Sequence, residues 1–210
     1  MFFANLIQSN MKNIQSIVIK INYMKKTIIA IAIMLFSSLT FAQSFNGVAI
    51  SGSMQTAVNA FKAKGFTVTD NLQNITVMKG KIQNQTVELY IKVTPKTKQV
   101  YAFSMYFPKQ ISWSGITSEY DRLKDILIEK YGQPSNEYDF FSTPYFLGDG
   151  YELQALRLEK CTYASYWFDK DNMNVSIEMS KYEQVNLSYE NVKNVELKNK
   201  EQGQVNKTIF

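Results

Sequence analysis

The stretch from Ser118 to Pro134, S-E-Y-D-R-L-K-D-I-L-I-E-K-Y-G-Q-P, predicts a complete helix around which the chain is organised. Ser118 is typical of an N-cap, with Asp121 at N3, because its side-chain oxygen can accept from backbone N–H groups that lack a carbonyl. Gly132 and Pro134 predict the end, since glycine adopts the left-handed cap conformation and proline cannot continue a helix. The apolar residues form one stripe that must pack against a sheet: Tyr120, Leu123, Leu127 and Tyr131.

Each half of the chain after residue 42 is predicted to contain one helix and several strands. Ser53 can cap a first helix that ends near Gly65. Alternation of apolar and polar residues then predicts strands at 66–70, 74–78, 87–93 and 101–107, and at 151–159, 161–168, 173–180 and 184–189. The expected fold class is α+β, with two helices packed on one face of an antiparallel sheet of about eight strands in a tandem α-β4 plan.

These elements predict one α+β domain over 43–190, made of two similar halves at 43–110 and 111–190. The last segment, 191–210, is rich in Asn, Lys, Glu and Gln and has few apolar residues. Such a composition buries little apolar surface, so we expect a flexible tail there.

The leader, 1–42, has the pattern of a secretory signal peptide. Met24, Lys25 and Lys26 precede an apolar run at 28–36, and small residues lead to an expected cleavage site after Ala42. We therefore expect Met24 to be the true start, and the product to be periplasmic or secreted. The apolar run is shorter than the roughly 20 residues of a transmembrane helix, so no membrane span is expected in the mature form.

Charge and composition exclude several classes of function. The full chain carries a net charge of +5, but four of its basic residues and no acidic ones precede the expected cleavage site. The remaining chain is nearly neutral, which argues against a nucleic-acid partner. The sequence contains no histidine, so the usual zinc ligand sets and histidine-based triads are not available, and we expect no metal and no cofactor. Cys161 is the single cysteine; we expect it to be buried, with no internal disulfide.

Several short motifs resemble those of small secreted bacterial proteins of unassigned function. They are F-N-G-V-A-I-S-G-S at 45–53, K-G-F at 64–66, K-Y-G-Q-P at 130–134 and V-N-L-S-Y at 185–189. The overall plan is similar to the β-lactamase inhibitor protein fold. That resemblance implies tandem helix-plus-four-strand units forming a curved sheet whose concave face grips a protein partner. It assigns no functional residue to this chain.

An aromatic segment follows the central helix, in a connection from Gln133 to Gly148 that is expected to be a long loop. Long loops in compact domains are usually functional or disordered, and a high aromatic content argues against disorder. The segment either packs under the sheet or presents its rings to a partner. The rings proposed for partner binding are Tyr138, Phe140, Phe141, Tyr145 and Phe146.

The strand predicted at 161–168 carries aromatic residues on both faces. Tyr163 and Trp167 point to one face, and Tyr166 and Phe168 point to the other. Helices covering one face would leave one pair open, and Tyr163 and Trp167 are proposed as partner-binding residues.

Together these features predict an exported protein that binds a protein or peptide without catalysis, as an inhibitor or adaptor does. One alternative is a module that binds carbohydrate or cell-wall glycan, since Tyr and Trp also suit sugar rings. A second is a carboxylate-based hydrolase, which requires two carboxylates to converge in one cleft. The candidates for that pair are Glu137, Asp139, Asp149 and Glu152.

Overall fold

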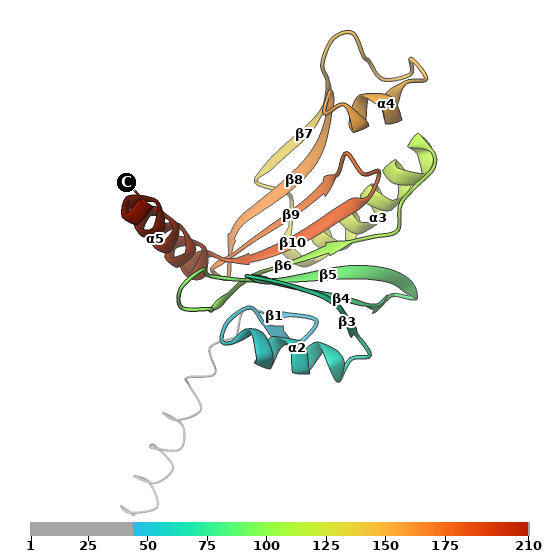
Figure 1. Ribbon diagram of the computed structural model, residues 1–210. Coiled ribbons are helices and arrows are strands. Elements are labelled where there is room, and N and C mark those ends of the chain that lie inside the picture. Colours follow the sequence, from blue (N-terminus) through green and yellow to red (C-terminus); the bar gives the residue numbers. More distant parts are fainter. Residues whose placement is uncertain (1–43, 210) are drawn as a thin grey trace, which may run out of the picture. The chain divides into compact units, whose positions relative to one another are not determined.

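The computed structural model describes residues 44–209, so the expected signal peptide and its cleavage site lie outside the described residues. Figure 1 shows the described elements, coloured along the chain. In chain order they are β1 (Ser44–Phe45), β2 (Val48–Ala49), α2 (Met54–Lys62), β3 (Thr67–Leu72), β4 (Ile75–Ile82), β5 (Gln85–Val93), β6 (Val100–Tyr106), α3 (Trp113–Tyr131), β7 (Asn136–Phe141), α4 (Glu152–Arg157), β8 (Cys161–Lys170), β9 (Met173–Met179), β10 (Val185–Asn191) and α5 (Val192–Ile209).

Eight strands form one antiparallel sheet in the order β3-β4-β5-β6-β10-β9-β8-β7, and β1 and β2 form a separate pair. The meander β3 to β6 follows α2, and the meander β7 to β10 follows α3. The two meanders join where β6 pairs with β10, from Tyr106 opposite Asn186 to Ala102 opposite Glu190. The predicted α+β class and tandem plan are therefore confirmed.

The helices α2 and α3 cover the same face of this sheet, which we call the helix face. The strand registers place Leu89, Met105, Leu187 and Ile177 in one row across the four central strands. All of these side chains are buried, in one core cluster with apolar residues of both helices. The two halves thus share a single hydrophobic interior rather than having one each.

The first helix forms where the sequence predicts it. Ser53 Oγ accepts a hydrogen bond from Thr56 N at 3.2 Å, which satisfies an otherwise unpaired N–H at the helix start. Phe61 is fully buried, with its ring centroid 5.1 Å from that of Phe103 in the sheet. Phe66 lies flat over Gly80, where a Cβ atom would come within 2.4 Å of the ring, so this strand position has room for glycine only.

The central helix ends where predicted but starts earlier. Gly132 has φ 79° and donates from its N–H to Ile128 O at 2.8 Å, so the predicted end is confirmed. The predicted start at Ser118 is wrong, because Ser112 is the N-cap and its Oγ accepts from Gly115 N at 3.1 Å. The extra turn adds Ile116 to the core, so burial of this residue favours the longer helix.

The segment 151–159, predicted as a strand, forms the short helix α4 instead. Ala155 and Leu156, which are consecutive, are both buried, as a helix permits and a half-exposed strand does not. Glu152 Oε1 accepts from Gly148 N at 2.8 Å, which holds the preceding turn against the helix. The apolar and polar residues here alternate in the sequence without forming a strand.

The connection after α3 is only partly a loop. Its first part forms β7, which pairs with β8 from Asn136 opposite Tyr166 to Phe141 opposite Cys161. The strand lies at the edge of the sheet. An exposed edge strand has no run of buried apolar residues from which it could be predicted. The prediction of a 16-residue loop is therefore wrong for this part.

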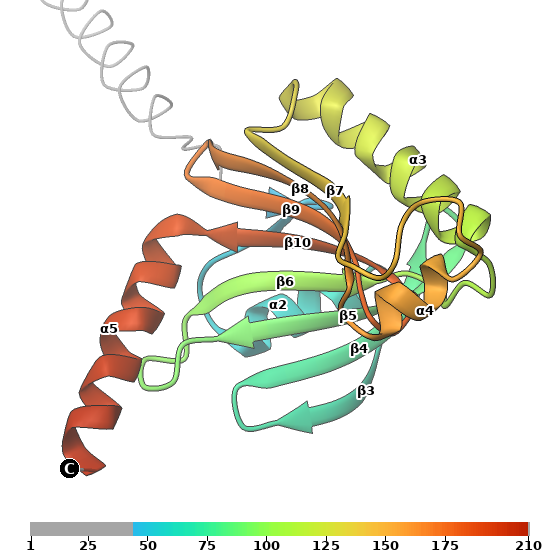
Figure 2. The ribbon, with the colours of Figure 1, turned by 90° about the horizontal axis from the view of Figure 1, so that it is seen from above.

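The final segment, predicted to be a flexible tail, forms the helix α5, which crosses the ends of β6 and β5 (Figure 2). Glu201 is buried, and its carboxylate accepts from Lys96 N at 2.6 Å and Thr97 Oγ1 at 2.6 Å in the β5–β6 turn. Asn194 Nδ2 donates to Val100 O at 2.7 Å. Polar anchoring, rather than an apolar stripe, attaches this helix to the sheet.

Candidate binding surface

The sheet has a second face, opposite α2 and α3, which we call the open face. One row of paired residues crosses it from edge to centre: Tyr138, Ala164, Glu178, Asn186, Tyr106 and Glu88. A neighbouring row consists of Asn136, Tyr166, Ser176, Ser188, Ser104 and Tyr90. The open face therefore has tyrosines towards both sides and short polar side chains between them.

The aromatic rings of the open face form two groups. Tyr90 and Tyr106 pack edge to face with ring centroids 5.1 Å apart. On the other side, Tyr166 lies 6.0 Å from Tyr138 and is stacked on Phe168 at 5.9 Å. Phe140 and Phe168 are about half exposed, at 49% and 46%, so this second group presents apolar surface to solvent.

The polar strip between the two groups is internally hydrogen-bonded. Ser104 Oγ lies 2.7 Å from Ser188 Oγ and accepts from Lys92 Nζ at 2.9 Å. Burial lowers the pKa of Lys92, although the carboxylates of Glu190 and Glu178 oppose that shift. The ammonium group is thus held at the bottom of the face rather than extended into solvent.

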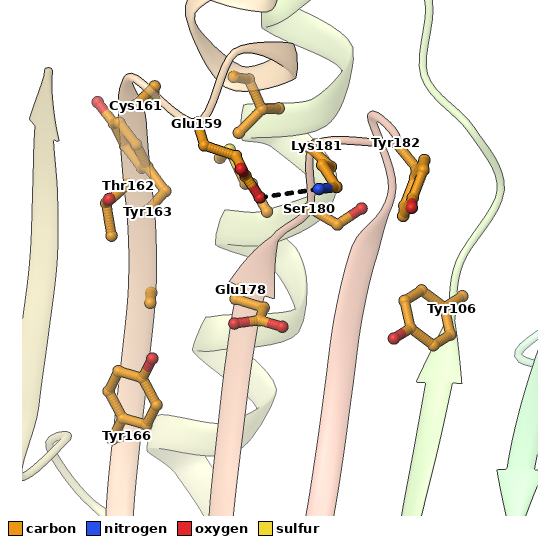
Figure 3. Close-up of a pocket in the computed structure, with 13 residues that line it drawn as sticks. Tyr106, Glu159, Cys161, Thr162, Tyr163, Tyr166, Glu178, Ser180, Lys181 and Tyr182 are labelled. Carbon is orange, nitrogen blue, oxygen red and sulfur yellow. Dashed lines mark ion pairs between the residues drawn. The ribbon is translucent and has the colours of Figure 1, made fainter. Parts of the chain in front are cut away.

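A pocket of about 360 Å³ opens on this face around Glu178 (Figure 3). Tyr106 and Tyr166 lie on either side of the Glu178 carboxylate, and Tyr182 lies near the pocket's edge. Burial and the nearby Glu178 charge raise the pKa of both Tyr106 and Tyr166. Both phenols therefore stay protonated at neutral pH and can donate hydrogen bonds.

A second hollow, of about 460 Å³, lies beside it over the edge strands. Its walls are mostly aromatic, from Tyr138, Phe140, Tyr166 and Phe168. Tyr166 lines both hollows, so a ligand that spans them would contact this residue in each.

The structure divides the seven residues proposed for partner binding. Tyr138 and Phe140 lie on the open face, as binding requires. Trp167 is fully buried on the helix face, where Nε1 donates to Gly132 O at 2.7 Å, so its assignment to a binding surface is wrong. Tyr163 packs between Trp113 and Tyr120 of α3, with ring centroids 5.3 and 6.1 Å away, and is likewise part of the packed interior.

The three remaining proposed residues lie at the end of β7 and in the loop after it. Phe141 packs against Trp113, with ring centroids 5.6 Å apart, on the helix face. Tyr145 packs on the core, and its hydroxyl accepts from Gln154 Nε2 at 3.1 Å. Phe146 is 63% exposed and lines a separate hollow of about 500 Å³ with Pro144 and Tyr145.

Four further residues of the open face and its pocket were not predicted from the sequence: Tyr90, Tyr106, Glu178 and Tyr182. The signal for the first three is the strand alternation itself. Tyr90 lies between Leu89 and Ile91, which are both buried, so it must point to the opposite face. Tyr182 lies in the turn between β9 and β10, where no periodicity marks it.

Three of the four carboxylates proposed for a hydrolase accept hydrogen bonds or form an ion pair within the protein. Glu137 pairs with Lys124 of α3. Asp149 accepts from Phe146 N at 3.0 Å and Tyr151 N at 2.7 Å, whereas Glu152 holds the turn before α4. Asp139 is exposed on β7. Two of these carboxylates therefore stabilise one local loop and a third pairs with a helix.

Metal coordination and thiol chemistry have no support in the described part of the chain. No group of three or more acidic or cysteine side chains within residues 44–209 is placed to hold a metal ion. Cys161 is buried as expected, and burial, with the nearby Glu152 charge, raises its pKa to about 12. Among residues 44–209, no helix has the length and apolar character needed to traverse a lipid bilayer.

Comparison of the chain with protein-family models, with curated proteins and with solved structures finds no match.

Proposed function

We propose that this protein is exported and binds another protein or a peptide, without catalysis, on the open face. The observation that carries the proposal is the group of exposed rings beside the pocket, Tyr138, Phe140 and Phe168, with Tyr166 between pocket and rings. Aromatic side chains supply large contact areas at low entropic cost, and tyrosine combines an apolar ring with a hydrogen-bonding group.

The mixture of rings and short polar groups on the open face also supports this proposal. Interfaces between proteins combine a central apolar or aromatic region with a polar surround that forms hydrogen bonds. Ser188 and Asn186 lie beside the aromatic groups and are themselves hydrogen-bonded. A partner would therefore contact ordered polar groups as well as rings.

The test begins by capturing the partner through the open face. A photoreactive phenylalanine analogue at position 166 should cross-link the partner, and the same analogue at Ile111, which is 93% exposed, should not. The partner identified by mass spectrometry is then purified, and its Kd is measured for each variant.

Phe140→Ser combined with Tyr138→Ser should weaken binding of that partner by about 2 kcal/mol or more, which is roughly 30-fold. Ile111→Ser is the control, because it removes an even more exposed apolar side chain outside the open face, 93% exposed against 43% for Tyr138 and 49% for Phe140. Unchanged affinity in the double variant, with an unchanged melting temperature, would show that the open face is not the binding surface.

A glycan is the alternative ligand, and the parallel stacking of Tyr166 on Phe168, with an interplanar angle of 13°, supports it. Flat ring faces suit sugar rings. Titration with cell-wall oligosaccharides separates the two proposals, because saturable binding at millimolar or lower concentration would favour the glycan.

A further inference from the structure

We propose that the pocket around Glu178 receives a positively charged side chain, Lys or Arg, of the partner. This inference rests on the proposed function and specifies the partner's chemistry at one point of the open face. It follows from a carboxylate without a cation, two tyrosine rings that flank it, and neighbouring lysines that are engaged elsewhere.

The carboxylate of Glu178 is oriented but has no counter-ion. Glu178 Oε1 accepts from Asn186 Nδ2 at 2.9 Å, which fixes the carboxylate in the pocket. No lysine or arginine among the described residues forms an ion pair with it. Binding of a cation to this half-buried, unpaired carboxylate is favourable, because part of the desolvation of the carboxylate has already occurred in the free protein.

The walls of the pocket favour a cation over a neutral group. Tyr106 from β6 and Tyr166 from β8 stand on opposite sides of Glu178 (Figure 3). Aromatic faces attract ammonium and guanidinium groups, and they also pack against the methylene stems of Lys and Arg. Both phenols remain protonated, and the other two charged side chains that line the pocket, Glu159 and Lys181, pair with each other. The unpaired charge in the pocket lining is therefore that of Glu178.

Two lysines near Glu178, Lys181 and Lys92, pair with other groups. Lys181 lies on its edge, but Nζ pairs with Glu159 at 3.0 Å (Figure 3). Lys92, which interacts electrostatically with Glu178, donates to Ser104 at 2.9 Å instead. The protein's own cations are thus directed to other acceptors.

Asn186 adds unused acceptor capacity next to the carboxylate. The residue is only 7% exposed, and its Oδ1 has no hydrogen-bond partner among the described residues. Its Nδ2 must face Glu178, because a carboxylate only accepts, so the amide cannot turn to pair Oδ1 there. A guanidinium, with five N–H donors, suits a site with several acceptors better than a neutral side chain does.

Three capped tripeptides probe this pocket directly: Gly-Lys-Gly, Gly-Arg-Gly and Gly-norleucine-Gly. The full exported chain, labelled with ¹³C on its tyrosine rings, is titrated with each peptide and followed by NMR. The Lys and Arg peptides should shift the signals of Tyr106 and Tyr166 saturably. Norleucine, which has an apolar chain of similar length and no charge, should not shift them.

Glu178→Gln should weaken binding of the Lys and Arg peptides about tenfold, because it removes the charge and keeps the shape. Glu129→Gln is the control, since it makes the same charge change on an exposed position of α3, on the other side of the sheet. Melting temperatures of both variants should match that of the wild type, as neither glutamate forms an ion pair in the described structure.

The proposal is overturned if norleucine binds as well as lysine, if neither charged peptide binds, or if Glu178→Gln binds them unchanged. Competition of the peptides by a neutral oligosaccharide at lower concentration would also overturn it and favour a sugar site. A protein partner that binds wild type and Glu178→Gln equally, and loses affinity with the Tyr138 and Phe140 double variant, would refute only the cation pocket. If neither Glu178→Gln nor the Tyr138 and Phe140 double variant lowers the affinity for the partner, the proposed function itself is refuted.

Discussion

At the scale of single residues, Cys161 shows how burial determines reactivity. Because only the thiolate is nucleophilic and the pKa is raised to about 12, the folded protein should hold this thiol unreactive at pH 8. Labelling with a thiol reagent should proceed at least 100-fold faster in 6 M guanidinium chloride than in buffer. Rapid labelling of the folded chain would contradict the burial of Cys161.

Trp167 and Tyr166 show which part of the surface can be predicted from sequence at this scale. Strand alternation correctly places these neighbours on opposite faces, but it does not say which face the helices cover. That choice depends on α3, whose C-cap residue Gly132 accepts a hydrogen bond from Trp167 through its carbonyl oxygen. A contact between residues 35 positions apart has no local signature, so the sequence alone does not predict that this ring is buried.

At the scale of elements, the start of α3 distinguishes two serines. Ser112 caps the helix, so Ser112→Ala should lower the free energy of unfolding by about 1 kcal/mol. Ser118 lies inside the helix and is exposed, so Ser118→Ala should be neutral or slightly stabilising, as alanine is the better helix former. Urea denaturation of both variants measures the difference, and the reverse order would place the N-cap at Ser118.

The elements with the strongest periodicity are also those that the sequence predicted correctly. β5, β9 and β10 alternate between buried and partly exposed residues or carry a clear apolar row, and α2 has its cap and its stripe. In contrast, β7 forms at the sheet edge by pairing with β8, and α5 is held by contacts to a distant part of the chain. Glu201 of α5, for example, binds a turn more than 100 residues earlier. Such a contact cannot be predicted from the pattern of residues around Glu201.

At the scale of the whole molecule, Glu183 links three segments that are distant in the sequence. Lys109, in the connection between the halves, pairs with Glu183 at 2.5 Å, and Arg157 of α4 also pairs with it. The hydrogen bond from Lys109, and those from Arg157, lower the pKa of Glu183 below its ordinary value of 4.5, although burial opposes this shift. The charged carboxylate therefore stabilises the folded protein.

A lowered pKa in the folded state means that this stabilisation is present above pH 4.5 and is lost as the pH falls below that value. Glu183→Gln should reduce stability by about 2 kcal/mol at pH 7 and should reduce the loss of stability between pH 5 and pH 3. Urea denaturation across that range, with Glu190→Gln as the control for a change of charge, measures both effects. An identical pH profile for wild type and Glu183→Gln would contradict this role.

The shared interior also indicates how the chain could be divided. The two halves are joined within the sheet through the pairing of β6 with β10, and Ile111, in the connection between the halves, is 93% exposed. A fragment ending at Ile111 would expose the edge of β6, and a fragment starting at Ser112 would expose the edge of β10. The two fragments should therefore recombine on mixing, as in a split-protein reporter. The complete open face, and with it binding of a partner, should be restored only when both fragments are present.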